Sequence, residues 1–177
     1  MLLEANRSQL LVIDLQTRLL PHLLDAEALE ANVLRLVAAA RALEVPVLVS
    51  EQYPAGLGPS TPDLATALRP GEMFEKTRFS AADEPALTGG KEHGQWVLCG
   101  AEAHVCVLQT ALAMKARGWD VAVVADAISS RAAFSKAIAL RRLAASGVEV
   151  VTTEMVLFEW LADARHPAFK TVSGLVK

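Results

Sequence analysis

The 177-residue sequence is poor in the features that mark several classes of protein. It contains only two cysteines, too few for the disulfide framework of a small secreted domain, so we expect both thiols to be free. Lysine and arginine number 17 against 20 aspartates and glutamates, which gives a net charge of −3. Because a nucleic-acid surface needs clustered positive charge, this balance predicts no nucleic-acid partner.

Long apolar runs are also missing. None reaches the roughly 18 residues that a membrane-spanning helix requires, so we expect no membrane association. The first residues, MLLEANRSQLLVIDLQ, lack the basic region, the apolar region and the small-residue cleavage site of an export signal. Together with the free thiols, these absences predict a cytoplasmic protein in a reducing setting.

The sequence does contain enough apolar material for a core, since 53% of its residues are hydrophobic and 21% are charged. No internal repeat, low-complexity tract or long linker divides the chain. A length of 177 residues suits one domain that folds without disulfides or metals. We therefore expect residues 1–177 to form a single domain.

Short apolar runs alternate with segments of helical periodicity. In segment 25–43, apolar side chains recur at Leu29, Val33 and Leu36, and Asp25 is placed to cap the start of the helix. The expected strands lie in 8–16, 45–50, 71–81, 95–100, 120–127 and 148–153, and the expected helices are 25–43, 104–118, 133–146 and one from about 154. Such alternation is typical of an α/β fold with a mostly parallel sheet and helices on both faces.

Glycine and proline residues mark the expected helix ends and a loop. Gly118 and Gly147 directly follow two of the expected helices, where a left-handed glycine commonly ends a helix. Segment 51–64, EQYPAGLGPSTPDL, is rich in both residue types and predicts a loop.

Three unusual residues fall at strand ends, where ligands of parallel α/β sheets bind. Asp14 follows the first apolar run, Lys76 follows the short strand MFE, and Cys106 opens the helix after QWVLCG. At a helix start, N–H groups and the helix dipole favour a thiolate. Each residue also has an ordinary interpretation: a loop-entry or capping aspartate, a solvated surface lysine and a small buried cysteine.

Taken together, these residues indicate nucleophilic catalysis. A cysteine nucleophile needs a base that removes its proton and a cation that holds the charged base in place. Cys106, Asp14 and Lys76 supply these three chemical types. Their spacing alone leaves open whether they converge.

Four long stretches, in collinear order, resemble the isochorismatase-like cysteine hydrolase family: LLVIDLQ, FEKTRFSA, VLCGAEAHVCVLQTALAMKARGWDVAVVADAISSR and TTEMVLFEWLADARHPAFK. The string EQYPAGLGPSTPDL is similar to that of the isochorismatase domain-containing subgroup. The resemblance covers nearly the whole chain and implies a three-layer α/β/α fold and a homo-oligomer, a dimer or larger. In the apolar C-terminal helix, Met155, Phe158 and Leu161 either supply an interface or face the core.

The resemblance also implies a catalytic arrangement. It maps an Asp–Lys–Cys triad onto Asp14, Lys76 and Cys106, and a cis peptide bond onto Ala101–Glu102. The backbone N–H groups of Glu102 and Cys106 are then expected to form the oxyanion hole. The implied activity is hydrolysis of an amide- or carbamoyl-type C–N bond in a small molecule, through a Cys106 thioester and without a cofactor.

Departures from relatives narrow this expectation. Nicotinamidases of the family bind a metal through an Asp-x-His motif, where this chain reads SEQYPAGLG. The histidines of this chain show no metal-ligand spacing, so we expect no metal site; they are His22, His93, His104 and His166. True isochorismatases lack the nucleophilic cysteine, so Cys106 argues against that activity. Ala103 stands where relatives often carry threonine.

The alternative to a hydrolase is a binding or assembly module that keeps the fold but has weak or no activity.

Loop residues near the strand ends are the candidate substrate contacts, each with ordinary packing as its alternative: Gln52, Tyr53, Phe79 and His104. Cys99 lies inside a strand and is expected to be a buried filler, not a disulfide partner of Cys106. Asp126 is expected to cap the AISSR segment that follows it.

Overall fold

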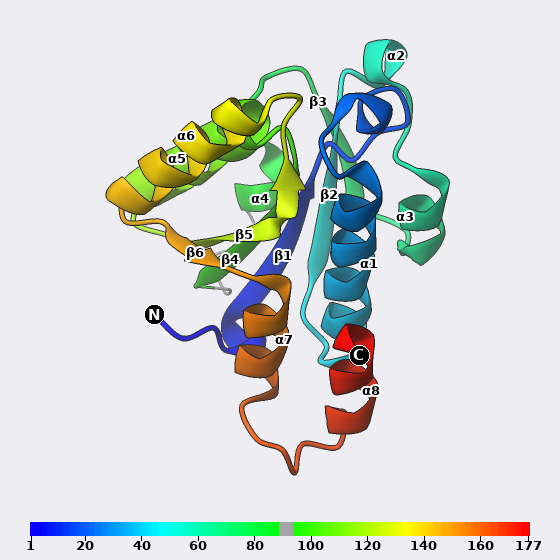
Figure 1. Cartoon of the computed structure of the whole chain (residues 1–177), viewed down its shortest axis with the longest axis vertical. Coiled ribbons are helices and arrows are strands. Elements are labelled where there is room, and N and C mark those ends of the chain that lie inside the picture. The colour runs from blue at the N-terminus through cyan, green and yellow to red at the C-terminus, as the bar shows by residue number, and fades with distance from the viewer. Residues whose placement is uncertain (89–93) are drawn as a thin grey trace.

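The computed structural model describes residues 1–88 and 94–177, so His93 lies outside the described residues. A sheet of six parallel strands runs through the centre in the order β3-β2-β1-β4-β5-β6 (Figure 1). The strands are β1 (Ser8–Ile13), β2 (Val47–Gln52), β3 (Met73–Lys76), β4 (Gln95–Ala101), β5 (Asp120–Ser129) and β6 (Glu149–Val151). The expected parallel sheet is confirmed.

The apolar runs form the middle of this sheet because they are covered on both faces. Every residue of β1 and of β4 is buried. In register, Ile13 of β1 lies between Ser50 of β2 and Gly100 of β4. The carboxyl ends of these three strands therefore meet at one edge of the sheet, next to Asp14.

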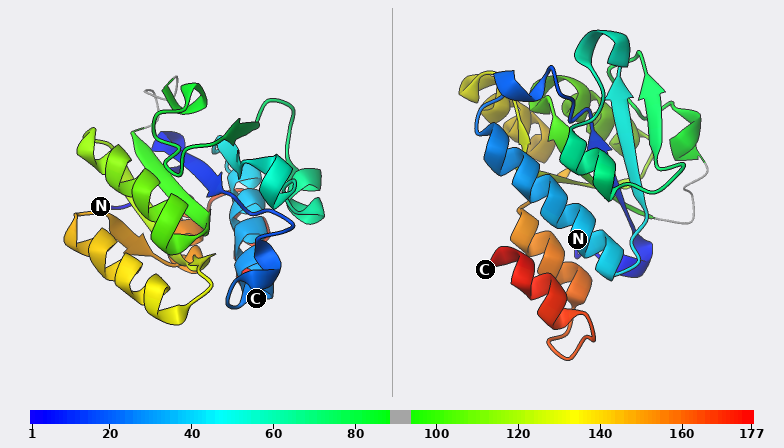
Figure 2. Two further views of the ribbon diagram at one scale, coloured as in Figure 1. Left: turned by 90° about the horizontal axis from the view of Figure 1, so that it is seen from above. Right: turned by 90° about the vertical axis from the view of Figure 1, so that its right-hand side faces the viewer.

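Helices cover both faces of the sheet, as Figure 2 shows from above. One core cluster packs α1 (Ala26–Ala42), α7 (Thr153–Leu161) and α8 (Phe169–Ser173) against one face. A second cluster packs α5 (Leu108–Ala116) and α6 (Ala133–Ala145) against the other. The three-layer α/β/α architecture is thus confirmed. Among the described residues, no helix is long and apolar enough to cross a membrane.

Short helices complete the chain. They are η1 (Ala5–Arg7), η2 (Leu20–His22), α2 (Pro54–Leu57), α3 (Pro62–Ala67), α4 (Pro85–Thr88), the π-helical turn η4 (Ala103–Val107) and η5 (Gly174–Val176). The prediction of a loop over 51–64 is wrong in part, because β2 extends to Gln52 and α2 and α3 follow. In both short helices proline occupies the first turn, where its missing N–H costs nothing, so the same residues that suggested a loop start helices.

The predicted helix ends are confirmed at Gly118 and Gly147, which have φ angles of 80° and 75° directly after α5 and α6. Asp25 does precede α1, but its side chain makes no capping hydrogen bond. Asp126 lies inside β5 instead of at its end. Its carboxylate caps α7, accepting hydrogen bonds from Thr153 N at 2.7 Å and from Thr153 Oγ1 at 3.0 Å.

Gly100 allows β4 to approach β1 closely. Its φ of 108° is rare for residues with a side chain. A Cβ atom at this position would lie 2.0 Å from the carbonyl oxygen of Ile13. Only glycine fits beside the residue that precedes Asp14.

Candidate active site

The sheet brings Asp14, Lys76 and Cys106 together from three separate segments. Asp14 directly follows β1, Lys76 is the last residue of β3, and Cys106 lies in η4 after β4. The Lys76 Nζ and Asp14 Oδ2 atoms form an ion pair of 2.7 Å, and both side chains are almost fully buried. The Cys106 thiol interacts with both charged groups strongly enough to change its own pKa.

Asp14 is fixed by the strand end that carries it. Its φ of 53° is unusual for a non-glycine residue and turns the chain sharply as it leaves β1. Its backbone N–H donates to Ser50 O at 3.0 Å, and its Oδ1 accepts a hydrogen bond of 2.7 Å from Ser50 Oγ. Burial raises the pKa of the Asp14 carboxyl, and hydrogen bonds and the charge of Lys76 offset only part of that rise. A raised pKa makes this carboxylate a stronger base.

Lys76 is a structural cation instead of the surface lysine that its sequence context alone would favour. Its side chain is inaccessible to solvent. Besides Asp14, its ammonium group contacts Gln52 Oε1 at 2.7 Å and the backbone oxygens of Phe79 and Arg78 at 3.2 and 3.3 Å. Because a buried ammonium must be paired and hydrogen-bonded, these contacts fix its position.

Two glutamines support the ion pair. The Gln52 amide bridges Lys76 and the backbone, since its Nε2 donates to Thr77 O at 2.7 Å. Gln16 in turn clamps the backbone of Gln52: it accepts from Gln52 N at 2.8 Å and donates to Gln52 O at 3.1 Å. The position of Lys76 therefore depends on residues at the ends of both β1 and β2.

Cys106 is held as a thiol. Only 6% of the residue is exposed, and burial together with the negative charge of Asp14 raises its thiol pKa to about 12. The expectation of a thiolate at this position is wrong, because burial and the negative charge of Asp14 outweigh the charge of Lys76. A nucleophilic role for this sulfur needs a base in contact with it, and Asp14 is that neighbour.

The chain between β4 and Cys106 turns sharply. The peptide bond between Ala101 and Glu102 is cis, at the position that the family resemblance implies. The Glu102 side chain is nearly buried and binds Arg131, accepting from its backbone N–H at 3.0 Å and from its Nε at 3.1 Å. This bidentate contact connects the turn to the segment after β5.

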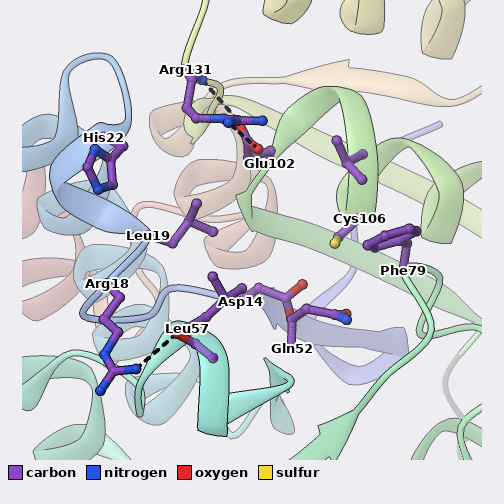
Figure 3. A pocket seen from close by; sticks show the side chains of 12 residues that line it. Asp14, Arg18, Leu19, His22, Gln52, Leu57, Phe79, Glu102, Cys106 and Arg131 are labelled. Carbon is purple, nitrogen blue, oxygen red and sulfur yellow. Dashed lines mark hydrogen bonds and ion pairs between the residues drawn. The ribbon is translucent and has the colours of Figure 1, made fainter.

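A cavity of about 680 Å³ opens beside the three residues (Figure 3). Of the predicted substrate contacts, Gln52 and Phe79 line it, together with Asp14 and Cys106. The remaining lining residues are Arg18, Leu19, His22, Gly56, Leu57, Glu102, Val105 and Arg131. The cavity thus has charged groups at its walls and several apolar side chains among them.

The other two predicted contacts lie elsewhere. Tyr53 is 58% exposed and lines a separate hollow of about 250 Å³ with Glu75 and Glu84. Its φ of 38° turns the chain away from the cavity directly after Gln52. His104 pairs with Ser130, with 2.9 Å between Nδ1 and Oγ, and lines a third hollow beside α6. The structure therefore does not place either side chain on the wall of the cavity.

Several residues that support the site or line its cavity escaped the sequence analysis. Ser50 and Gln16 are polar residues at the ends of buried strands, which is the same signal that identified Asp14. Arg18 and His22 carry no such signal, because they lie in the connection between β1 and α1 and not at the end of an apolar strand. Only their shared lining of the cavity identifies them.

Cys99 is fully buried within β4 and unpaired, as expected for a filler. Within residues 1–88 and 94–177, no three histidine, cysteine, aspartate or glutamate side chains are placed to hold a metal ion.

Comparison with known proteins identifies the family of this chain. The model of the isochorismatase domain matches residues 8–155 of the chain. The chain belongs to the isochorismatase family. Isochorismatase domain-containing protein 2 of Danio rerio is 40% identical over 178 residues, which cover 98% of this chain and 89% of that protein. The Homo sapiens protein of the same name is 38% identical, with 96% and 83% covered.

Solved structures of the isochorismatase fold superpose closely. The structure described as MAR1 ribonuclease from Caenorhabditis elegans has a TM-score of 0.96 and 35% identity, covering 99% of this chain and 92% of its own. The YcaC protein of Escherichia coli, described as an octameric hydrolase of unknown specificity, has a TM-score of 0.92 at 24% identity, with 99% and 90% covered. The second likeness concerns the fold alone.

Proposed function

We propose that this isochorismatase-family protein is a cofactor-independent cysteine hydrolase that cleaves a small amide- or carbamoyl-type C–N bond. The observation that carries the proposal is the position of the Asp14 carboxylate, which is ion-paired to buried Lys76 and interacts with the Cys106 thiol. A base of raised pKa beside a protonated nucleophile is the arrangement that general-base activation requires.

The reaction begins when Asp14 accepts the thiol proton while the Cys106 sulfur attacks the carbonyl carbon of the substrate. The C–S bond forms, and the carbonyl electrons move to an oxyanion that the backbone N–H groups of Glu102 and Cys106 stabilise. Collapse of this intermediate breaks the C–N bond, and Asp14 returns its proton to the leaving nitrogen. The products of this half are a thioester and an amine or ammonia.

Water then completes the cycle. Asp14, again a carboxylate, takes a proton from water as the water oxygen attacks the thioester carbon. The C–S bond breaks, the acid is released, and the proton on Asp14 returns to the Cys106 sulfur. Lys76 keeps its charge throughout and holds Asp14 in place.

The test is a screen of primary amides and carbamoyl compounds for release of ammonia or amine. We expect turnover by the wild type, with Cys106→Ala and Asp14→Asn at least about 1,000-fold slower, as for removal of a nucleophile or its base. Cys99→Ala is the matched control, because Cys99 is a buried thiol outside the cavity. Full turnover by Cys106→Ala would contradict the mechanism.

RNA belongs in the same screen, because the relative from Caenorhabditis elegans is described as a ribonuclease. We expect no cleavage of RNA that depends on Cys106, since the net charge of −3 disfavours a polyanion. Turnover of no amide by the wild type would instead favour the alternative, a binding or assembly module.

Self-association is part of the proposal. Met155 and Phe158 of α7 are 45% and 40% exposed, whereas Leu161 is buried in the core. An interface would cover the exposed pair. Light scattering is expected to show a dimer or larger assembly.

A further inference from the structure

One charged side chain that lines the cavity has no ion-pair partner among the described residues. The two acidic residues of the cavity each face a cation, Asp14 at 2.7 Å from Lys76 and Glu102 at 3.1 Å from Arg131. Of these two cations, only Arg131 lines the cavity, and Arg18 lines it as well. Among residues 1–88 and 94–177, no carboxylate forms an ion pair with Arg18. Arg18 is therefore the uncompensated charge of the cavity.

The backbone holds Arg18 in place. Its Nη1 donates to the carbonyl oxygens of Ala55 and Gly56 at 3.3 and 3.1 Å, and its own N–H donates to Leu57 O at 3.0 Å. These contacts fix the guanidinium against α2 but neutralise no charge. In the described part of the chain, Nε and Nη2 have no hydrogen-bond partner, so one edge of the planar fork remains available to a ligand.

His22 also lines the cavity, and its imidazole makes no hydrogen bond to any described side chain. An imidazole has an N–H donor in either protonation state. Figure 3 shows Arg18 and His22 on one side of the cavity and Cys106 with Phe79 on the opposite side. The nucleophile and the unpaired cation thus face the cavity from opposite walls.

We propose that Arg18, with His22 on the same side of the cavity, binds a carboxylate group that the substrate carries at the end remote from the scissile C–N bond. The inference deepens the proposed function and rests on it. An arginine fork binds a carboxylate through two parallel hydrogen bonds, the arrangement that best discriminates an anion from a neutral amide. The cavity also has an apolar lining that suits a short carbon chain; it consists of Leu19, Leu57, Phe79 and Val105.

Matched substrates test this subsite. Succinamate, glutaramate and adipamate each carry one amide and one carboxylate at increasing separation, and their diamides lack the charge. We expect the wild type to prefer the best amic acid over its diamide by about 10- to 100-fold in kcat/KM, the range for hydrogen bonds to a charged group. Arg18→Gln is expected to remove this preference, because kcat/KM should fall at least about 10-fold more for the amic acid than for the diamide.

Arg18→Lys and Arg141→Gln are the matched variants. Lysine keeps the charge but not the fork, so we expect it to restore part of the preference. Arg141 is an exposed residue of α6 outside the cavity, and its loss changes the net charge equally without affecting the preference. An Arg18→Gln effect of the same size on both substrates, or no preference in the wild type, overturns the subsite.

A binding readout separates the two proposals. Glutarate, an unreactive dicarboxylate, is expected to slow alkylation of Cys106 by iodoacetamide in the wild type at least about 5-fold more than in Arg18→Gln, while neutral glutaramide protects both equally. Protection without any turnover would reject the hydrolase and keep the anion subsite. Turnover that depends on Cys106, with glutarate protecting the wild type and Arg18→Gln equally, would keep the hydrolase and reject the anion subsite.

Discussion

Lys76 joins the Asp14 carboxylate to the Gln52 amide: its Nζ lies 2.7 Å from Asp14 Oδ2 and 2.7 Å from Gln52 Oε1. The second contact is the more informative, because it shows that a predicted substrate contact is already engaged. With its Nε2 bonded to Thr77 O, the Gln52 amide uses both of its ends within the protein. Gln52 is thus a positioning residue for Lys76, although it also lines the cavity.

Substitution of Gln52 is expected to affect the proposed catalysis through Lys76. Gln52→Ala removes one acceptor from a buried ammonium, and we expect kcat to fall about 10-fold or more. Gln52→Glu places a second carboxylate near Asp14 and raises the pKa of that base. The acidic limb of the pH–rate profile should then move upward by about one unit. Tyr53→Phe is the control, because Tyr53 is next in the chain but outside the cavity. If the acidic limb of the pH–rate profile stays in place in Gln52→Glu, Gln52 does not position Lys76.

The protonation state of Cys106 gives a second prediction. Since burial and Asp14 raise the thiol pKa to about 12, the fraction of thiolate should grow with pH throughout the range 7 to 10. The rate of alkylation by iodoacetamide, followed by intact mass with Cys106→Ala as the blank, is expected to rise through this range without a plateau. A plateau below pH 8 would mean a low-pKa thiolate and would exclude the Asp14-coupled mechanism.

Activity should follow the titration of Asp14 at lower pH. Burial raises the pKa of this carboxyl, and only its ionised form accepts the thiol proton. kcat/KM is therefore expected to increase as the pH rises through a value above that of an ordinary aspartate. Asp14→Asn should lose this limb together with the activity. If kcat/KM still rises with pH in the same range in Asp14→Asn, the titrating group is not Asp14.

The buried ion pair should be costly to break. Lys76→Met leaves the Asp14 carboxylate without its cation in a site with almost no solvent access, and we expect the free energy of unfolding to fall by about 3–5 kcal/mol. Adding Asp14→Asn removes the stranded charge and is expected to recover part of that loss. Urea denaturation measures both. Arg165→Met, which breaks the exposed pair with Asp163, should leave the unfolding curve unchanged.

Gly100 provides a prediction about the fold. In Gly100→Ala the new methyl group would meet the backbone of Ile13 at 2.0 Å, which neither strand can relieve without parting β1 from β4. We expect a protein that is unfolded or insoluble. Gly118 also has a left-handed φ, but no atom lies within 4 Å of a Cβ placed there. Gly118→Ala should therefore cost only about 1–2 kcal/mol of stability, and equal losses in the two variants would contradict the steric argument.

Local patterns in the sequence determined most of the fold. Alternating apolar runs and helical segments specify a parallel sheet covered on both faces, because each run must be buried on two sides and each amphipathic helix on one. The same logic placed Asp14, Lys76 and Cys106 at strand ends. The prediction of a loop over 51–64 was wrong in part, since proline is common both in loops and in the first turn of short helices.

Tertiary structure decided the site. The contact between Asp14 and Lys76 spans 62 positions of sequence, and no local pattern encodes such a distance. Gln52 and Tyr53 are neighbours in the chain, yet one faces the cavity and the other solvent, because the backbone turns between them. The Cys106 thiol shows the same division: its place near a helix start favours a thiolate, whereas burial beside a carboxylate, a property of the folded molecule alone, keeps the proton on sulfur.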